Sequence, residues 1–251
     1  MIEWRDDGIV LSARPHGETA SVVHVLTPER GRHAGLVQGG QGRKARAIYQ
    51  PGNLLTVTWS GRLADNLGSF KCELGTSYAA RFLDSPKRLC ALTAAAAICE
   101  RALPEREAHP ACYHGFIALL DSLEGDHWAE VYVRWELGLL ADLGFGLDLS
   151  QCAAGGDNDQ LAYVSPRTGR AVSLAAGEPY REKLLLLPPF LIGRGGGGPD
   201  EVAQGLQLSG HFLARSVFHL QDRPLPPARE RLAGLFPGAS GASGSSGGQA
   251  I

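Results

Sequence analysis

The sequence predicts an α+β fold in which a small antiparallel barrel or sandwich of five strands precedes a mostly helical region. Two observations carry this prediction. Short apolar alternations, separated by glycine and proline, fill residues 8–75. After Thr76 the apolar residues instead recur at helical spacing. Because strands and helices occupy different parts of the chain, the fold belongs to the segregated class.

The five expected strands are rich in Val, Leu and Ile and are bounded by turn residues. Turns are predicted at Pro15–Glu18, Thr27–Gly31 and Ser60–Arg62, where glycine and proline cluster with polar residues. Such spacing is typical of a small barrel. The strands are predicted at Ile9–Leu11, Ser21–Leu26, His33–Val37, Leu54–Trp59 and Leu67–Leu74.

Three helices follow with recognisable ends. Ser85–Pro86 reads as an N-cap with proline at the first helical position, and Pro104 ends that helix. A second helix begins near Pro110. A third covers residues 126–143 and ends at Gly144. The apolar stripe expected on the third helix comprises Trp128, Val131, Trp135, Leu139 and Leu143.

The rest of the chain is less regular. Residues 145–177 carry loop signals, a short helix is expected before Pro188, and further helices are expected at about 200–220 and 226–235. The Gly/Ser-rich tail is expected to be disordered. The predicted domains are therefore a barrel at 1–80, a helical domain at 81–237 with an internal loop region around 145–177, and a disordered tail at 238–251.

Bulk properties narrow the class of protein. The 251 residues carry a formal net charge of −2, so a nucleic-acid interface would have to be a local basic surface. No apolar run approaches the roughly 20 residues that span a bilayer, and the N-terminus has no secretory pattern. We therefore expect a cytoplasmic protein without membrane contact. Five widely spaced cysteines indicate reduced thiols.

A basic, glycine-rich segment at residues 39–46 is the most informative feature. Arg43, Lys44 and Arg46 fall within four residues, beside glycines that let a backbone approach a phosphodiester. We expect this segment to be a loop beside the open face of the barrel, where it could follow the phosphates of a single strand. The alternative is an ordinary solvated surface. Residues at neighbouring strand ends that could extend the basic surface are Arg14, Arg32, His33 and Arg62.

Aromatic residues that could stack on bases are scarce in the first 80 residues. Trp59 and Phe70 lie inside strand patterns, which favours core positions. Tyr49 directly follows the basic segment and is therefore the better stacking candidate.

The sequence contains little that supports a metal site or a catalytic site. Cys152 has no nearby cysteine partner, and His109, Cys112 and His114 lie at the start of an apolar helix. No nucleophile elbow, Walker loop, zinc-protease motif or dinucleotide fingerprint is present in the sequence. The sequence therefore predicts no catalytic residues, no metal site and no cofactor.

A second basic region lies near the C-terminal end. Arg215 falls between Phe212 and Phe218, and an arginine-edged apolar surface of this kind could hold an acidic, hydrophobic peptide of a partner protein. The alternative is an ordinary amphipathic core helix.

The order of several motifs resembles the RecO family of recombination mediators. The N-terminal motifs are Gly8–Leu11, Arg14-x-x-Gly17-Glu18, Leu26-Thr27 with Gly31, and Arg43–Arg46 followed by Gln50-Pro51. Trp135–Phe145 and Leu149-x-x-Cys152 match the family's central helix and the loop after it. The resemblance covers about residues 5–235.

This resemblance implies an OB-type barrel before a helical domain, and a non-catalytic role in DNA repair. It implies binding of single- and double-stranded DNA, annealing of complementary strands, and action on strands coated by single-strand-binding protein. It further implies a RecR-type partner, indirect cooperation with the RecA recombinase, and a bacterial, nucleoid-associated location. Arg43, Lys44 and Arg46 match the family's basic loop.

The chain departs from zinc-bearing members of that family, because Cys152 stands where they have four cysteines. We therefore predict a zinc-free loop. Two other functions remain to be distinguished. One is a protein–protein adaptor whose barrel does not bind DNA. The other is a nucleic-acid hydrolase, for which the sequence offers no convincing set of metal-binding carboxylates.

Overall fold

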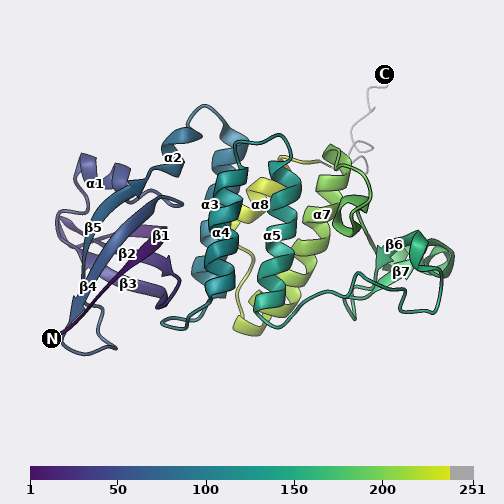
Figure 1. Cartoon of the computed structure of the whole chain (residues 1–251), viewed down its shortest axis with the longest axis horizontal. Coiled ribbons are helices and arrows are strands. Elements are labelled where there is room, and N and C mark those ends of the chain that lie inside the picture. The colour runs from purple at the N-terminus through teal and green to yellow at the C-terminus, as the bar shows by residue number, and fades with distance from the viewer. Residues whose placement is uncertain (238–251) are drawn as a thin grey trace, which may run out of the picture. The chain divides into compact units, whose positions relative to one another are not determined.

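A computed structural model describes residues 1–237, so the disorder predicted for residues 238–251 lies outside the described residues. Five strands close into the expected OB-like barrel, in the order β1-β2-β3-β5-β4 (Figure 1). The strands are β1 (Ile2–His16), β2 (Ala20–Thr27), β3 (Gly31–Val37), β4 (Leu54–Gly61) and β5 (Ser69–Thr76). The first strand is much longer than the sequence pattern indicated.

Alternation along the strands builds the barrel interior. On β2, Val23 and Val25 are fully buried, whereas the alternating residues Val22 and His24 are only partly buried. Trp59 and Phe70 also point inward, so the prediction that both are core residues is confirmed. The interior cluster consists of Val10, Val23, Val25, Val37, Tyr49, Leu55, Val57, Trp59 and Phe70.

The basic segment differs from the expected loop. Residues 43–48 form a short helix, α1 (Arg43–Ile48), between β3 and β4. Its sequence of Arg, Lys and Ala favours helix, and the glycines before it confine the turn to residues 39–42. The basic side chains are therefore presented by a helix.

The helices after the barrel follow the predicted order. Ser85 is the N-cap residue of α3, and Pro86 occupies its first turn, although the Ser85 side chain makes no capping hydrogen bond. Gly144, with φ of 85°, follows the end of α5 as predicted. The helices are α2 (Tyr78–Arg81), α3 (Pro86–Ala102), α4 (Pro110–Ser122), α5 (Trp128–Asp142), α6 (Leu174–Gly177), α7 (Pro199–Phe212) and α8 (Pro227–Gly234).

The buried stripe of α5 agrees with the predicted one only at Trp135 and Leu139. Val131 and Leu143 are only partly buried, whereas Tyr132, Val133 and Leu140 are buried, together with the carboxylate-bearing Glu136. Glu136 accepts a hydrogen bond from the Ser209 hydroxyl of α7 at 2.5 Å. A buried polar pair of this kind is invisible to an apolar periodicity.

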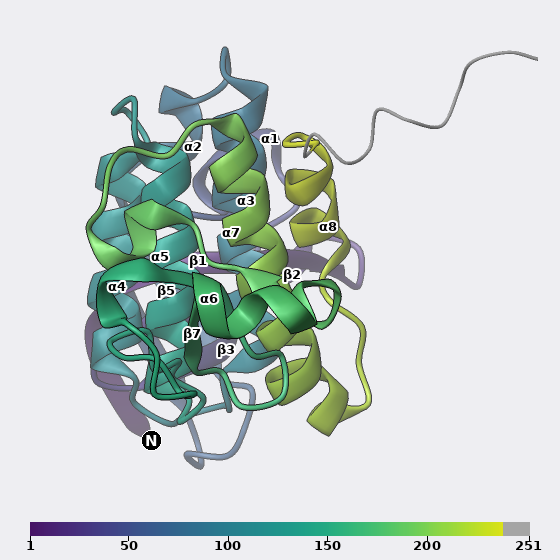
Figure 2. The ribbon, with the colours of Figure 1, turned by 90° about the vertical axis from the view of Figure 1, so that its right-hand side faces the viewer.

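Residues 145–177, expected to be loop-like, contain strands of a small sheet with the order β7-β6-β8. Figure 2 shows α6 beside β7. The strands are β6 (Leu161–Val164), β7 (Ala171–Ser173) and β8 (Leu185–Leu186). Short 3-10 turns lie at Asn158–Gln160, Glu178–Lys183, Pro189–Ile192 and His219–Gln221, and α7 continues as a π-helical stretch at Leu213–Phe218.

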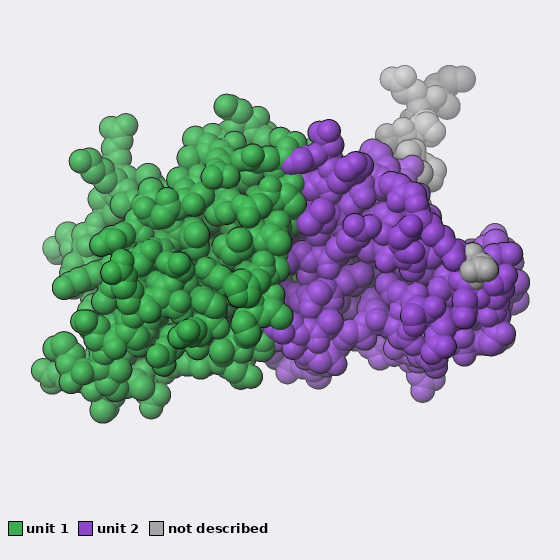
Figure 3. All heavy atoms as spheres, in the orientation of Figure 1, with its two compact units in different colours: residues 1–124, 225–232 green, residues 125–224, 233–251 purple. Residues whose placement is uncertain are grey.

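The chain divides into two compact units (Figure 3). One contains residues 1–124 and 225–232, and the other contains residues 125–224 with those from 233 onward. The barrel thus shares its unit with α2, α3, α4 and most of α8. Within residues 1–237, no helix is long and apolar enough to cross a membrane.

Candidate nucleic-acid interface

The helix α1 presents its three cations to solvent. Arg43, Lys44 and Arg46 are exposed, whereas Ala45 and Ile48 pack against the barrel core. The first turn of α1 holds no acidic residue, and none of the three cations forms an ion pair within the described part of the chain. Their charge is therefore available to an external anion.

Asn53 fixes α1 on the barrel. Its side chain is fully buried, and Nδ2 donates to the carbonyls of Ala47 and Ile48, both at 3.0 Å. Its Oδ1 accepts the backbone N–H of Ala79 at 3.1 Å. One amide therefore satisfies two carbonyls at the C-terminal end of α1 and joins it to the start of α2. No sequence signal points to this role, because an asparagine after Pro51–Gly52 reads as a turn residue.

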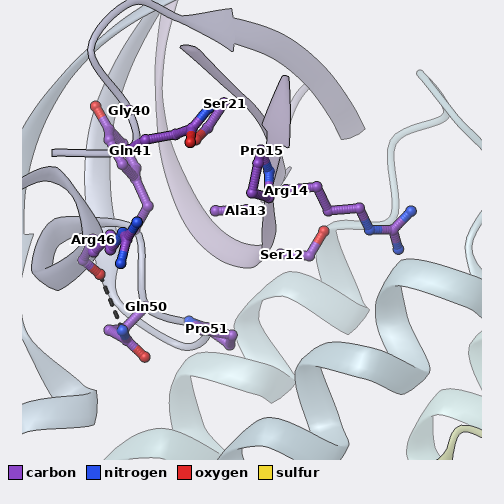
Figure 4. Close-up of a pocket in the computed structure, with 11 residues that line it drawn as sticks. Ser12, Ala13, Arg14, Pro15, Ser21, Gly40, Gln41, Arg46, Gln50 and Pro51 are labelled. Atoms are coloured by element: carbon purple, nitrogen blue, oxygen red, sulfur yellow. Dashed lines mark hydrogen bonds between the residues drawn. The ribbon is translucent and has the colours of Figure 1, made fainter. Parts of the chain in front are cut away.

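A pocket of about 450 Å³ lies between α1 and the second half of β1 (Figure 4). Gln41 fixes one side of the pocket, because its Nε2 donates to the carbonyls of Gly17 and Ala20 at 3.0 and 2.9 Å. Arg14 and Arg46 lie on opposite sides of the pocket. The other lining residues are Ser12, Ala13, Pro15, Ser21, Gly40, Tyr49, Gln50 and Pro51. Two predicted cations thus meet at one concave surface.

Arg14 is partly neutralised there. Its side chain extends toward α3, where its Nη2 lies 2.7 Å from Oε1 of Glu100. The carboxylate is only 11% exposed and also accepts the Ser12 hydroxyl at 2.6 Å. The Arg14 side chain itself is 64% exposed, so it can still reach a phosphate.

Arg32 does not belong to this surface, which corrects the sequence prediction. Its Nε donates to the carbonyl of Leu103 at 2.8 Å, and its Nη1 lies 3.1 Å from Oε1 of Glu105. The same segment covers Gly31, where an added Cβ would lie 1.7 Å from the carbonyl oxygen of Glu107. The outer face of β2 and β3 is the surface that OB folds use for oligonucleotides, and here residues 100–107 cover much of it. The basic segment therefore does not adjoin an open face.

Arg62 lies at the other end of the barrel. Gly61 pairs with Ile2 at the start of β1, whereas His16 and Ala20 pair beside the turn that precedes α1. In Figure 1, α1 lies at the top of the barrel and the N-terminus at its bottom. Arg62 is exposed but cannot share one phosphate contact with α1.

His33 and Tyr49 are both interior residues. His33 is 5% exposed inside the barrel, so it does not extend the basic surface. Tyr49 is 8% exposed, and this burial raises the pKa of its hydroxyl. The hydroxyl forms a hydrogen bond with the Cys72 side chain. The ring reaches the wall of the pocket but has no free face for a base. The stacking role predicted for Tyr49 is therefore wrong.

The predicted partner surface is only partly accessible. Phe218 is fully buried, so it cannot contact a partner, and the core-helix alternative is correct for this residue. Phe212 is 4% exposed but reaches a cavity of about 330 Å³ that Arg167, Arg215 and the exposed Leu220 also line. Arg215 donates from Nη1 to the carbonyls of Pro166 and Arg167. Arg215 therefore braces the loop after β6 at the edge of this cavity.

The Cys152 region does not fit a zinc ion. The Ser173 hydroxyl lies 3.5 Å from Cys152 Sγ, and the Ser173 backbone N–H donates to the sulfur at 3.2 Å. These contacts and nearby backbone N–H groups lower the pKa of Cys152 to about 7. Among the side chains that the structure describes, no three His, Cys, Asp or Glu residues gather to hold a metal ion. The zinc-free loop remains a prediction.

Comparison with known proteins agrees with this layout. A family model described as "Recombination protein O N terminal" matches residues 1–78, and one described as "Recombination protein O C terminal" matches residues 83–224. "DNA repair protein RecO" of Rhodospirillum centenum is 56% identical over 245 residues, which cover 97% of this chain and 98% of that relative. Proteins of the same description from Rhodospirillum rubrum and Phenylobacterium zucineum are 50% and 52% identical, over 92% and 91% of this chain and 95% of each relative.

Proposed function

Because this chain belongs to the RecO family of non-catalytic recombination mediators in DNA repair, we propose that it binds single- and double-stranded DNA through α1. It would anneal complementary strands and help load the recombinase onto strands coated by single-strand-binding protein. The observation that carries this proposal is the set of exposed, unpaired cations Arg43, Lys44 and Arg46 on one fixed helix. Cations that neutralise phosphates release counterions, which drives sequence-independent binding.

The pocket beside α1 supports the same proposal. Arg46 and Arg14 line its two sides, so a phosphodiester could be held between them. Gly40 also lines the pocket, and its lack of a side chain lets it pack against Ser21, because an added Cβ would lie 2.7 Å from Cβ of Ser21. Gln50, whose Nε2 donates one hydrogen to the carbonyl of Arg46, has a second amide hydrogen that adds a neutral donor without sequence preference. A nonspecific mediator requires this kind of surface.

Salt-dependent binding tests the DNA site. Replacing Arg43, Lys44 and Arg46 with alanine should weaken binding of a single strand. It should also reduce the slope of log K against log[salt] by about 0.7 for each phosphate that is no longer neutralised. The matched control removes Arg5, Lys71 and Arg81, three exposed cations elsewhere in the same unit. An unchanged slope in the α1 variant would exclude α1 and favour the adaptor alternative.

Annealing tests the mediator role. The chain should accelerate pairing of complementary strands both when they are bare and when they carry single-strand-binding protein, whereas the α1 variant should lose the first activity. An adaptor would have no effect on bare strands. The partners proposed here are therefore DNA, single-strand-binding protein and a RecR-type protein, with the recombinase acting downstream.

A protein partner could use the cavity beside Arg215. Arg167 and Arg215 edge this cavity, and Phe212 and Leu220 line it, which suits an acidic peptide with apolar side chains. Replacing Leu220 with aspartate should abolish binding of such a peptide without disturbing the core, because Leu220 is 71% exposed. Unchanged peptide affinity would place partner binding elsewhere.

A further inference from the structure

A second cavity lies at the other end of the barrel, near the start of β1. Its volume is about 200 Å³, below the roughly 300 Å³ at which pockets for drug-sized ligands begin. It therefore suits a single planar ring system. The turn between β2 and β3 and the loop between β4 and β5 both contribute to its walls. Its main lining residues are Trp4, Arg30, His33, Trp59, Ala64 and Arg106.

Three aromatic rings form its inner wall. Trp4 and Trp59 stack with centroids 5.9 Å apart and an interplanar angle of 13°. His33 stands edge-on to both, at 5.0 and 5.1 Å, with interplanar angles of 87° and 81°. Trp59 is fully buried, but Trp4 is only partly buried. Trp4 is therefore the ring that a ligand can reach.

Arg30 forms the outer wall. Its guanidinium lies over the Trp4 ring at 6.0 Å from the centroid, the outer limit of a cation–π contact. Because Arg30 is exposed and its guanidinium lies at that limit, the side chain has room to shift and cover a planar group. Arg106 is less free, since its Nη2 donates to the carbonyls of Asp65 and Asn66 at 2.9 and 3.1 Å.

His33 has an unmet requirement for hydrogen bonds. Its side chain is more than nine-tenths buried, and neither Nδ1 nor Nε2 has a hydrogen-bond partner in the described structure. Buried polar groups normally find partners. Burial lowers the pKa of His33 to about 4, so the ring is neutral and offers one donor and one acceptor. The edge of a nucleobase offers the complementary groups.

We propose that this cavity takes one unpaired nucleobase of a bound DNA strand, stacked between Trp4 and Arg30 with its polar edge toward His33. The proposal rests on the DNA-binding function proposed above. The cavity suits the base of a nucleotide better than its phosphate, because Glu29 also lines the cavity and Asp65 pairs with Arg106. A phosphate would meet those carboxylates, whereas a neutral base would not.

Photo-cross-linking tests the position of the base. A thymidine oligonucleotide containing 5-iodouracil is bound to the full chain, irradiated and digested with trypsin. Peptide 1–5 contains Trp4 as its one aromatic residue, which makes the adduct unambiguous. We expect the adduct on this peptide. Adducts confined to other peptides would overturn the proposal.

Affinity gives an independent readout. Arg30→Met and Trp4→Ala should each weaken binding of a thymidine strand, and the loss of one stacked base corresponds to about 5- to 150-fold. Arg30→Met is informative even if Trp4→Ala folds poorly, because Arg30 is exposed. Lys71→Met, another exposed cation on the barrel, is the control for charge.

The outcomes separate this proposal from the general one. A wild-type chain that binds DNA but is indifferent to Arg30→Met and Trp4→Ala would overturn the base pocket and leave the α1 site intact. A wild-type chain that binds no DNA would overturn the proposed function itself. If Lys71→Met weakens binding as much as Arg30→Met does, the loss of affinity is explained by the change in net charge. That result would also overturn the base pocket.

Discussion

Arg14 and Glu100 form an ion pair at 2.7 Å that ties β1 of the barrel to α3. Glu100 also accepts the Ser12 hydroxyl at 2.6 Å and lies 3.7 Å from Nδ1 of His24. One carboxylate, 11% exposed, therefore joins three barrel side chains to the helix. It also withholds part of the charge of a cation that lines the pocket beside α1.

Glu100→Gln should strengthen DNA binding while weakening the fold. The amide keeps the shape but removes the negative charge, so Arg14 becomes fully available to a phosphate. The fall of log K with log[salt] should become steeper by about 0.7. The free energy of unfolding should decrease by about 1–3 kcal/mol. Glu105→Gln, which changes the same charge beside Arg32, is the control. An unchanged slope in Glu100→Gln would remove Arg14 from the DNA site.

Asn53→Ala should impair α1 without altering its charge. The carbonyls of Ala47 and Ile48 would lose their donor, and the N–H of Ala79 its acceptor. We expect a stability loss of about 1–3 kcal/mol by urea denaturation, together with weaker DNA binding. Asn66→Ala, in an exposed loop, should change neither. Full DNA affinity in a destabilised Asn53→Ala would show that α1 does not need this anchor.

His33 should make stability depend on pH. Burial places its folded-state pKa at about 4, below the unfolded value of 6.5. The stabilisation is therefore fully present above pH 6.5 and is lost as pH falls toward 4, by about 3 kcal/mol at most. His33→Phe should flatten this part of the profile, measured by urea denaturation. His16→Asn, at an exposed position, should retain the wild-type profile; an equally flat profile there would contradict the assignment.

Arg32→Met should separate stability from DNA binding. The carbonyl of Leu103 would lose its donor, so stability should fall by about 1–3 kcal/mol, while the salt slope of DNA binding stays unchanged. Arg43→Met should do the reverse, lowering the slope by about 0.7 with unchanged stability. A lower slope for Arg32→Met would return Arg32 to the interface.

Metal removal should have no effect. The Cys152 sulfur is satisfied by Ser173, and the described structure brings no further ligand to it. Elemental analysis of the purified chain should find no stoichiometric zinc, and a chelator should leave Tm unchanged. One zinc ion per chain, with a lower Tm after chelation, would contradict the zinc-free loop.

The strand and helix classes were predictable because apolar periodicity is a local property. Val23 and Val25 alternate as a barrel strand requires, and Gly144 ends α5 where the sequence placed the stop. The small sheet of β6, β7 and β8 was missed because its strands are two to four residues long and lie among turn signals. Its pairing depends on contacts that no short window contains.

The sequence predicted which residues of the candidate site carry charge, but not which side chains are accessible to solvent. Arg43, Lys44 and Arg46 are exposed as the sequence indicated, yet Arg32, Tyr49 and Phe218 are held or buried by tertiary contacts. Asn53 escaped notice for the same reason, since its three hydrogen bonds join segments that only the folded chain brings together. A residue type reveals what a side chain can bind, whereas its surroundings decide whether it is free to do so.

The unusual length of β1 sets the distance between the two ends of the barrel. Trp4 and Arg14 lie ten residues apart on this strand, which is at most about 33 Å at roughly 3.3 Å per residue, because β1 bends at the bulge between Val10 and Ser12. A stacked strand covers that span in about ten nucleotides at 3.4 Å each. The two DNA sites proposed above, at α1 and at the cavity beside Trp4, would then act as one bivalent binder, whose second contact forms at high effective concentration. Affinity should therefore rise steeply once an oligonucleotide is long enough to bridge both ends of the barrel, and this threshold length is built into one strand.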